Sequence, residues 1–457
     1  MLRKQFIDRY GELELLDGLW NRPGFSLFIL YGRRRIGKTR LLVEFAKGKK
    51  CVYYTAMEGS YDRICREFSE TVKRATGVPL AGDVIEILEW LARNTKEKLL
   101  VIIDEFQYIV EADPSIVSRL QRSIDSVLSQ SNLMLVLCGS AVSFFKRKFL
   151  GYRSPLFGRR TSSLKLAPLS FKYVRKYFSN YTIEDAIAAY SIVGGTPAYI
   201  IKLDPAKSLE ENILSIITPG SYLYDEAVNF LRQEVREPKT YFNILAALSE
   251  KSEKMSALAS AAKVDPRTLP KYIELLEELD VIEKIRKLGG RAVKIGFKDN
   301  YFRFWFTYIY RLRSLLEAYL LDEALDYILS TLDQYLSKVF EKLCSELLPE
   351  LYKHNIVPVR PVEKGSWWGK QAEIDIIVRE PGKATAFIEV KWRRLSLRDA
   401  EEILGQLEEK SSKTGLSSPQ NYYILICKEV EEKTPVKIDT YKSIIDLNII
   451  EKSKILR

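Results

Sequence analysis

The sequence has one histidine, His354, and five cysteines, which are scattered without any Cys-x-x-Cys pair. Because zinc sites need clustered imidazole and thiolate ligands, this composition excludes a zinc site, and we expect the cysteines to be buried as small apolar side chains. No apolar stretch approaches the roughly 18 residues that a membrane-spanning helix requires. The opening residues, MLRKQFIDRYGELELL, carry an acid by position 8 and a helical pattern, which a secretory signal does not show. We therefore expect a cytoplasmic protein that makes no contact with a membrane.

Positive charge, by contrast, is abundant. The chain has 71 lysines and arginines against 60 acids, a formal net charge of +11. A nucleic-acid partner, DNA first, is the most direct explanation. The alternative is a surface of Lys and Glu that serves thermal stability, and charge alone leaves both open. At 457 residues the chain is too long for one ordinary core, so we expect about three domains.

The sequence predicts a phosphate-binding loop near the amino end. FSLFILYGRRRIGKTRLLVEF (25–45) runs from an apolar strand through a glycine loop into a helix and fits GxxxxGK[ST]. Gly32 and Gly37 let backbone amides turn toward phosphates, Lys38 reaches the β- and γ-phosphates, and the Thr39 hydroxyl ligates Mg²⁺. We expect ATP or ADP to be bound by Gly32, Arg33, Arg34, Arg35, Ile36, Gly37, Lys38, Thr39 and Arg40. The three consecutive arginines are left open to contact nucleotide, protein or DNA.

A second apolar strand, KLLVIIDEFQYI (98–109), ends in two acids. Five consecutive apolar residues suit a strand buried on both faces of a parallel sheet. At its carboxyl end Asp104 is placed to hold Mg²⁺, directly or through water, and Glu105 to polarise the attacking water.

Two further segments add candidate residues to this domain. The strand NLMLVLCGSAVSFF (132–145) ends at Ser140, which either senses the γ-phosphate or caps the following helix, or does both. In SPLFGRRTSSLKLAPLSF (154–171), Arg159 and Arg160 are candidates for neutralising transition-state charge, in cis or in trans. The alternative is that they are two ordinary arginines of a basic protein.

The amino-terminal half resembles the archaeal ATPase family within the AAA+/STAND group of P-loop NTPases. The resemblance covers roughly residues 1–235, and its motifs are FIDRYGELELL (6–16), the phosphate loop, IIDEFQY, the Gly-Ser pair at 139–140, PLFGRR (155–160) and GGTPAYI (194–200). It implies that Arg9 lies near the nucleotide and that Pro197 packs near the base. Without the resemblance, GGTP predicts only a turn.

Residues 238–298 read as three helices and two strands, the pattern of a winged helix. Pro270 is tolerated there only if the third helix begins around Thr268, within its first turn. Arg267, Lys271 and Arg291 would then reach phosphates or bases. The alternative is an interdomain packing module or a lid on the nucleotide.

DNYFRFWFTYIYRLRSLLEAYL (299–320) alternates aromatic residues with Arg303, Arg311 and Arg313. This interleaving is one way to bind single strands, but we favour a core helix with a few arginines that extend to water.

The carboxyl end contains AEIDIIVREPGKATAFIEVKW (372–392), two strands joined by a Pro-Gly turn. Strand residues alternate faces, so Glu389 and Lys391 point to the same side, and Asp375 on the first strand converges with Glu389. Two close carboxylates repel unless a cation lies between them, and Mg²⁺ takes such oxygen ligands. An adjacent lysine completes the arrangement needed for metal-assisted phosphodiester hydrolysis. The alternative is a solvated edge hairpin.

Asp followed by Glu-x-Lys on strands resembles the PD-(D/E)xK nuclease superfamily, although the Pro-Asp dipeptide is absent. The resemblance implies a further acid from the helix around 333–351, for which Glu341 is the candidate, and Gln406 is a further candidate on the helix after the second strand. The metal ligands would be Asp375, Glu389 and Glu341.

We therefore predict a multidomain protein: an α/β P-loop NTPase core with a parallel sheet (1–170), a helical lid (171–235), a winged helix-turn-helix (236–298), a helical connector (299–335) and an α/β restriction-endonuclease-like domain (336–457). Three functions stay open. In the first, ATP turnover controls DNA cutting at the far site. In the second, the protein is a STAND-like regulator or sensor whose tail binds nucleic acid or partners without cutting. In the third, it is a motor or loader that acts as a homo-oligomer with arginines in trans.

Overall fold

The computed structural model describes residues 9–152, 154–431, 438–453 and 455. Its contacts divide the chain into two compact units, Met1–Pro168 with Thr196–Ala198, and Leu169–Gly195 with Tyr199–Arg457. Residues 6–8 of the amino-terminal motif lie outside the described part. The finer division into five segments remains a prediction.

The first unit is built on a parallel sheet of five strands in the order β2-β3-β4-β1-β5. The strands are β1 (Ser26–Tyr31), β2 (Cys51–Thr55), β3 (Leu99–Asp104), β4 (Leu133–Gly139) and β5 (Ser162–Lys165). Every residue of β1, β3 and β4 is buried, which is why these strands read as unbroken apolar runs. The predicted parallel sheet is confirmed.

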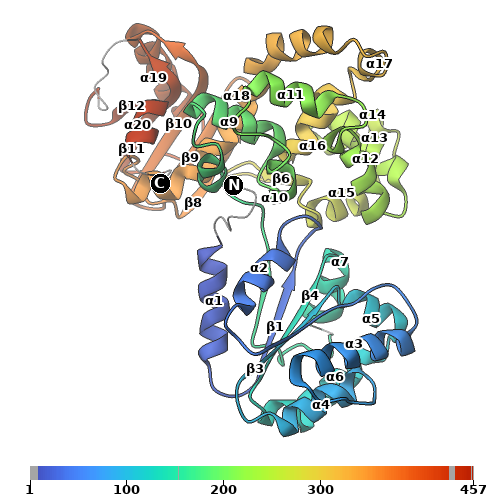
Figure 1. The fold of residues 1–457 in the computed structure, drawn as a ribbon. Coiled ribbons are helices and arrows are strands. Elements are labelled where there is room, and N and C mark those ends of the chain that lie inside the picture. Colours follow the sequence, from blue (N-terminus) through green and yellow to red (C-terminus); the bar gives the residue numbers. More distant parts are fainter. Residues whose placement is uncertain (1–8, 153, 432–437, 454, 456–457) are drawn as a thin grey trace. The chain divides into compact units, whose positions relative to one another are not determined.

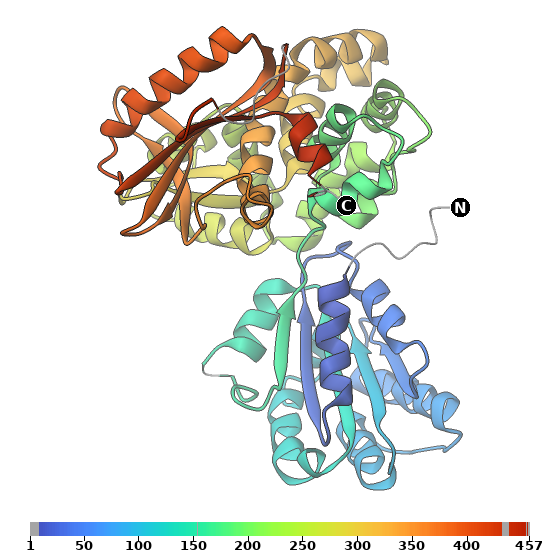
Figure 2. The same ribbon diagram turned by 90° about the vertical axis from the view of Figure 1, so that its left-hand side faces the viewer.

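Helices cover both faces of this sheet (Figures 1 and 2). The helices are α1 (Tyr10–Asn21), α2 (Lys38–Ala46), α3 (Tyr61–Thr76), α4 (Val84–Asn94), α5 (Gln107–Ala112), α6 (Ile116–Ser126) and α7 (Val142–Phe145). Leu27 and Ile29 belong to the core beneath α3 to α6, whereas Phe28 and Leu30 belong to the core beneath α1 and α2. Alternate residues of β1 thus belong to two different hydrophobic cores, one on each face of the sheet.

The second unit begins with a run of helices and one hairpin. The elements are α8 (Phe171–Tyr177), α9 (Ile183–Val193), α11 (Leu209–Ile217), α12 (Tyr222–Glu234), α13 (Pro238–Ser249), α14 (Met255–Ala262), α15 (Leu269–Glu278), β6 (Ile282–Arg286) and β7 (Val293–Phe297). The short α10 (Pro197–Ile200) contains the point where the chain passes from the first unit back into the second, between Ala198 and Tyr199. Thr268 is the N-cap of α15, so Pro270 falls in its first turn as expected. Three helices and a hairpin thus occupy the segment for which a winged helix is predicted, and that identification remains a prediction.

The turn of the hairpin packs against the carboxyl-terminal sheet of the same unit. The Leu288 amide donates to the Ser366 carbonyl at 2.9 Å, and the Leu288 side chain packs against the core of that sheet. The Lys287 ammonium lies 4.6 Å from the centre of the Trp367 ring. Arg291 is exposed beside this contact. A wing inserted in a DNA groove, as the sequence predicts, would have to leave this packed position.

The aromatic segment after the hairpin is broken into short pieces. They are α16 (Asn300–Phe304), the π-helical Trp305–Ile309 and α17 (Arg313–Glu317), followed by the long α18 (Leu321–Lys353). Tyr301, Phe302 and Phe304 are buried, so the aromatic residues form core, as favoured above, although not in a single helix. Among the described residues, no helix combines the length and apolar character needed to cross a membrane.

The carboxyl-terminal part is a mixed sheet with strand order β12-β11-β10-β9-β8. Its elements are β8 (Glu363–Trp368), β9 (Glu373–Glu380), β10 (Ala384–Leu395), α19 (Leu397–Ser412), β11 (Gln420–Val430), β12 (Lys442–Ile445) and α20 (Leu447–Lys452). β9 and β10 form the expected antiparallel hairpin, with Ile388 opposite Ile376, while β10, β11 and β12 run parallel.

Candidate functional site

The phosphate loop joins β1 to α2 with the geometry that its motif predicts. Gly37 caps α2 with φ +96°, in the left-handed region, and a side chain on Gly32 would meet the Leu166 carbonyl oxygen at 2.9 Å. Lys38 is buried, and its Nζ donates to the carbonyl oxygens of Gly32 at 2.8 Å and Arg33 at 3.0 Å. The loop's own carbonyls therefore hold the Lys38 ammonium group at the amino end of α2. The helix dipole and this ammonium group both favour the binding of an anion there.

Asp104 is the last residue of β3 and is buried beside the start of α2. Its Oδ2 accepts from Thr39 Oγ1 at 2.7 Å and from the Tyr53 hydroxyl at 3.0 Å. Burial and the Asp104 carboxylate raise the pKa of Tyr53, so its hydroxyl stays protonated as a donor. The two predicted magnesium residues of this unit, Thr39 and Asp104, are thus in contact.

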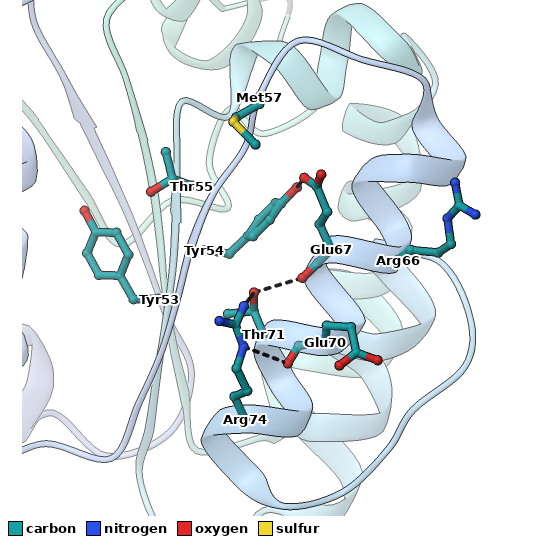
Figure 3. Close-up of a pocket in the computed structure, with 9 residues that line it drawn as sticks. All are labelled: Tyr53, Tyr54, Thr55, Met57, Arg66, Glu67, Glu70, Thr71 and Arg74. Atoms are coloured by element: carbon teal, nitrogen blue, oxygen red, sulfur yellow. Dashed lines mark hydrogen bonds between the residues drawn. The ribbon is translucent and has the colours of Figure 1, made fainter.

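The edge strand β2 sends its two tyrosines to opposite sides. Figure 3 shows Tyr53 on one side of the strand and Tyr54 on the other, beside α3. On the α3 side lies a cavity of about 430 Å³. Two arginines and two glutamates line it, so their charges balance and favour neither an anion nor a cation. This cavity is separate from the phosphate loop.

Glu105 follows Asp104 in an unusual backbone conformation. Its φ is +52°, which costs energy for a residue with a side chain and is found at sites where the surrounding contacts impose it. The Glu105 Oε2 accepts from Ser140 Oγ at 2.9 Å, from the Ser140 amide at 3.2 Å and from Gln107 Nε2. Ser140, directly after β4, therefore holds the acid that is predicted to polarise water. The N-cap residue of α7 is Ala141, so Ser140 does not cap this helix as one alternative predicted.

The two residues implied by the family resemblance lie against the phosphate loop. Arg9 is buried and donates to the Ile36 carbonyl at 3.2 Å and the Ala167 carbonyl at 2.8 Å. A side chain on Gly37 would lie 3.7 Å from Pro197 Cγ. Their predicted roles toward the nucleotide stay predictions.

The loop arginines differ from one another. Arg33 is fully buried and donates to Thr196 Oγ1, so it joins the loop to the GGTP segment rather than facing solvent. Arg34 lies 3.4 Å from the Tyr108 hydroxyl, and Arg35 has a left-handed φ of +70°. Arg40 is exposed on α2. Of the alternatives left open for these arginines, Arg33 makes a protein contact.

A second group of candidate residues is assembled in the mixed sheet of the other unit. The Asp375 Oδ2 accepts from the Val390 amide at 2.8 Å, which places its carboxylate beside Glu389. Glu389 is buried, and its Oε1 accepts from Lys391 Nζ at 2.8 Å and Lys410 Nζ at 3.1 Å. Burial and the nearby carboxylates of Glu341 and Glu389 raise the pKa of Asp375 to about 7.

The three predicted acids do not form one ligand group. Among the described residues, no set of three or more His, Cys, Asp or Glu side chains is arranged to hold a metal ion. Glu341 instead accepts from Lys338 Nζ at 3.2 Å. Gln406, the further candidate on α19, is exposed and donates to Glu402, while Lys410, one turn farther along α19, reaches Glu389; a role for Gln406 stays a prediction.

Comparison with known proteins identifies the family. A family model described as an ATPase domain predominantly from Archaea matches residues 6–203, and a model of archaeal and bacterial proteins of unknown function matches residues 305–403. MJECL04, an uncharacterized protein of Methanocaldococcus jannaschii, is 32% identical over 435 residues, which are 94% of this chain and 97% of the relative. The chain belongs to this archaeal ATPase family.

Two further similarities agree with this assignment. MJ0423 of the same organism, an uncharacterized ATP-binding protein, is 51% identical over 45 residues, 10% of this chain and 76% of the relative. The Walker-type ATPase PABY2304 of Pyrococcus abyssi has the same fold, with a TM-score of 0.52 and 18% identity over 66% of this chain and 97% of that one. The predicted P-loop ATPase, with an adenine nucleotide as its ligand, is confirmed at the level of family and fold.

The arginines of this archaeal ATPase at 159–160 lie far from its own phosphate loop. Thr161 exchanges hydrogen bonds with Leu27 at the start of β1, whereas the loop follows the end of that strand. Five residues of strand separate the two positions by about 16 Å. Arg159 instead binds Asp125 through two hydrogen bonds of 2.7 and 2.8 Å. This placement contradicts a finger in cis, and a role toward a second copy remains a prediction.

Sequence reasoning missed three residues of the ATPase site and one of the other. Tyr53 and Gln107 contact the two acids after β3, Thr196 accepts from Arg33, and Lys410 contacts Glu389. Gln107 could have been predicted, because it belongs to the same short motif, IIDEFQ, as the two acids. Thr196 lies in the GGTP motif, but its contact with Arg33 is not visible in the motif itself. Tyr53 and Lys410 come from separate elements and carry no local signal.

Proposed function

We propose that this protein is an ATP-hydrolysing switch that acts on nucleic acid through its second unit. The observation that carries the ATPase part is the convergence of Lys38, Thr39, Asp104 and Glu105 at one edge of the parallel sheet. The net charge of +11 supports a polyanionic partner.

Each residue of the ATPase site has one task in this proposal. Lys38 and the amides of the loop bind the phosphates, and Arg9 and Pro197 border the nucleotide. Glu105 accepts hydrogen bonds from Ser140 and Gln107, and it polarises water once it turns from them toward the γ-phosphate. The γ-phosphate would thus compete with Glu105 for Ser140, which links nucleotide state to the position of the catalytic acid.

The residues after β1 and β3 fit a magnesium ion. A hydroxyl and a carboxylate in contact, Thr39 and Asp104, are the donor types that Mg²⁺ takes in P-loop proteins. When bound, Mg²⁺ would neutralise charge on the β- and γ-phosphates.

The decisive experiment measures ATP binding and turnover by the full chain. Lys38→Ala is expected to lower turnover by at least about 100-fold, because it removes the cation that faces the phosphates. Lys47→Ala is the matched control, since this lysine lies at the opposite end of α2, away from the phosphate loop, and is largely exposed, with 66% of its side chain accessible. Wild-type protein that takes up neither ATP nor ADP in calorimetry contradicts the proposal.

A second function, metal-dependent cleavage of phosphodiesters, is supported by the acids of the mixed sheet. The Glu389 Oε2 is buried and has no hydrogen-bond partner in the described part of the chain, which leaves one carboxylate oxygen for a cation. Asp375 and Glu389 supply two carboxylates, and Mg²⁺ commonly takes one or two such ligands together with water and phosphate oxygens. Lys391 would orient water or stabilise the pentavalent phosphate.

Cleavage is tested with plasmid, single-stranded and branched DNA in Mg²⁺ or Mn²⁺, with and without ATP. We expect Glu389→Gln to abolish cutting while ATP turnover persists. Lys38→Ala should leave the chemistry at Glu389 intact and change only its dependence on ATP. Wild-type protein that degrades none of these substrates would instead support the regulator or sensor that binds without cutting.

A further inference from the structure

A cavity of about 450 Å³ lies within the second unit, where the end of α13, the π-helical segment 305–309 and the first half of α18 meet. Four cations line it, Lys251, Arg303, Arg311 and Lys338. Glu253 is the one acid among the described residues that line it, and its carboxylate lies 3.7 Å from Lys294. The cavity is therefore strongly positive and suits an anion.

Arg303 is the most informative residue of the cavity. Its Nη2 donates to the Phe297 carbonyl at 3.2 Å and its guanidinium carbon lies 5.9 Å from the centre of the Phe297 ring, but its buried Nε has no hydrogen-bond partner in the described part of the protein. Buried guanidinium N–H groups are rarely left without a hydrogen bond. The planar guanidinium group of arginine commonly donates two parallel hydrogen bonds to the oxygens of a phosphate. This second observation, independent of the charge count, points to a phosphate-bearing ligand.

Tyrosines supply the other half of the cavity wall. Tyr308 is buried and accepts from Thr331 Oγ1 at 3.1 Å, so it is fixed in place. Tyr327, which lies on α18 one helical turn before Thr331, also lines the cavity, and 47% of it is exposed. An exposed aromatic ring beside arginines is the combination on which unpaired bases stack.

The cavity continues along α18 toward the acids of the mixed sheet. Thr331, Tyr335 and Lys338 line the cavity, and Lys338 Nζ lies 3.2 Å from Glu341 Oε1. Ten residues of helix, from 331 to 341, span about 15 Å. Lys338 thus belongs both to the cavity rim and to the surroundings of Asp375.

We propose that this cavity binds a nucleotide unit of a single polynucleotide strand, whose phosphates contact Arg303, Arg311 and Lys251, whose base stacks on Tyr327, and whose chain continues past Lys338 to the carboxylates. The inference deepens the proposed function of that site and rests on it. A duplex fits less well, because its bases are already stacked and its grooves do not offer a free base to a tyrosine.

The test measures binding of a short fluorescent oligothymidine to the full chain in EDTA, so that cleavage plays no part. Arg311→Gln combined with Lys251→Gln is expected to weaken binding by about tenfold or more at moderate salt, and to reduce the slope of log K against log salt by about 1.4. Both residues are exposed, so folding should persist. Arg313→Gln combined with Lys254→Gln is the control: it removes the same two charges from exposed side chains that do not line the cavity, and Arg313 pairs with Glu317. Its effect should stay below about twofold.

Each alternative result has a defined meaning. Equal losses in the cavity variant and the control would show diffuse attraction and overturn the proposal, as would unchanged binding in both. Competition by thymidine monophosphate at the affinity of the oligonucleotide would assign the cavity to a free nucleotide, and tighter binding of duplex would also overturn it. If the cavity variant loses binding but wild-type protein cuts nothing in Mg²⁺ or Mn²⁺, the cleavage proposal fails and the strand site stands.

Discussion

The Thr39 hydroxyl donates a 2.7 Å hydrogen bond to Asp104, which connects the first turn of α2 to the end of β3 across 65 residues of sequence. Tyr53 donates to the same carboxylate oxygen from the neighbouring strand. Asp104, the acid that is proposed to hold Mg²⁺, is thus positioned by two hydroxyl groups, and only one of them, that of Thr39, belongs to the phosphate-loop motif.

Removing the Tyr53 hydroxyl tests how much the positioning of Asp104 matters, apart from the proposed binding of Mg²⁺ by Asp104. We expect Tyr53→Phe to lower the free energy of unfolding by about 1.5 kcal/mol, because it removes a hydrogen bond to a charged group. ATP turnover should fall by less than about tenfold, whereas Asp104→Asn should lower it by at least about 100-fold. Urea unfolding and a phosphate-release assay measure the two effects. Equal losses of turnover in both variants would contradict a merely positioning role for Tyr53.

Glu105 is expected to act in chemistry rather than in binding. Glu105→Gln should lower turnover by about 100- to 1,000-fold, since the amide cannot polarise water as a carboxylate does. The affinity for ATP should stay within about threefold, because Glu105 is bound to Ser140 and Gln107 rather than to the phosphate loop. Calorimetry with ATP and a single-turnover assay distinguish the two quantities. A loss of affinity equal to the loss of rate would show that Glu105 shapes the binding site.

Gly195 is required by a close approach of two backbone segments. A side chain there would overlap the Leu169 carbonyl oxygen, so Gly195→Ala should destabilise the fold by about 3 kcal/mol. Gly405→Ala is the control, because nothing lies within 4 Å of an added Cβ in the middle of α19. That control should stabilise by up to about 1 kcal/mol. Thermal unfolding of both variants gives the comparison, and a tolerated Gly195→Ala would contradict the backbone contact.

The raised pKa of Asp375 predicts a pH dependence of stability. A carboxyl group with a folded pKa of about 7 binds a proton more tightly in the folded than in the unfolded protein, so its contribution is present at low pH and is lost as the pH rises through 7. In EDTA, Asp375→Asn should therefore raise the thermal midpoint at pH 8 more than at pH 5. Asp326→Asn, at an exposed position of α18, should change neither. A gain from Asp375→Asn that is larger at pH 5 would refute the assignment.

Arg159 is expected to be dispensable for chemistry within one chain. Because it lies at the opposite end of β1 from the phosphate loop, Arg159→Ala should leave the turnover of dilute protein within about twofold of wild type. If chains associate at higher concentration, the variant should lose the additional turnover that association brings. Measuring turnover against protein concentration tests both statements, and a tenfold loss in dilute protein would contradict the placement.

The sequence alone allowed prediction of those features that depend on local spacing. The phosphate loop, the acids at the end of β3 and the hairpin that brings Asp375 to Glu389 all follow from motif spacing or strand alternation, whereas the contact between Ser140 and Glu105 was not predicted. The position of Arg159 did not, because it depends on β5 pairing with the edge of β1, which no spacing reveals. Lys410 and Tyr53 escaped for the same reason: each reaches its acid from a separate element, through packing that only the tertiary fold determines.

The contact between Leu288 and the core of the mixed sheet has a consequence for folding. Because a residue of the β6–β7 hairpin supplies part of the apolar interior beneath α19, the segment 236–298 and the carboxyl-terminal sheet are expected to gain and lose structure together. Severing the chain between residues 298 and 299 would leave an unfilled apolar hollow on one fragment and an exposed leucine on the other. The two modules that look separable in sequence are therefore expected to unfold in one cooperative transition.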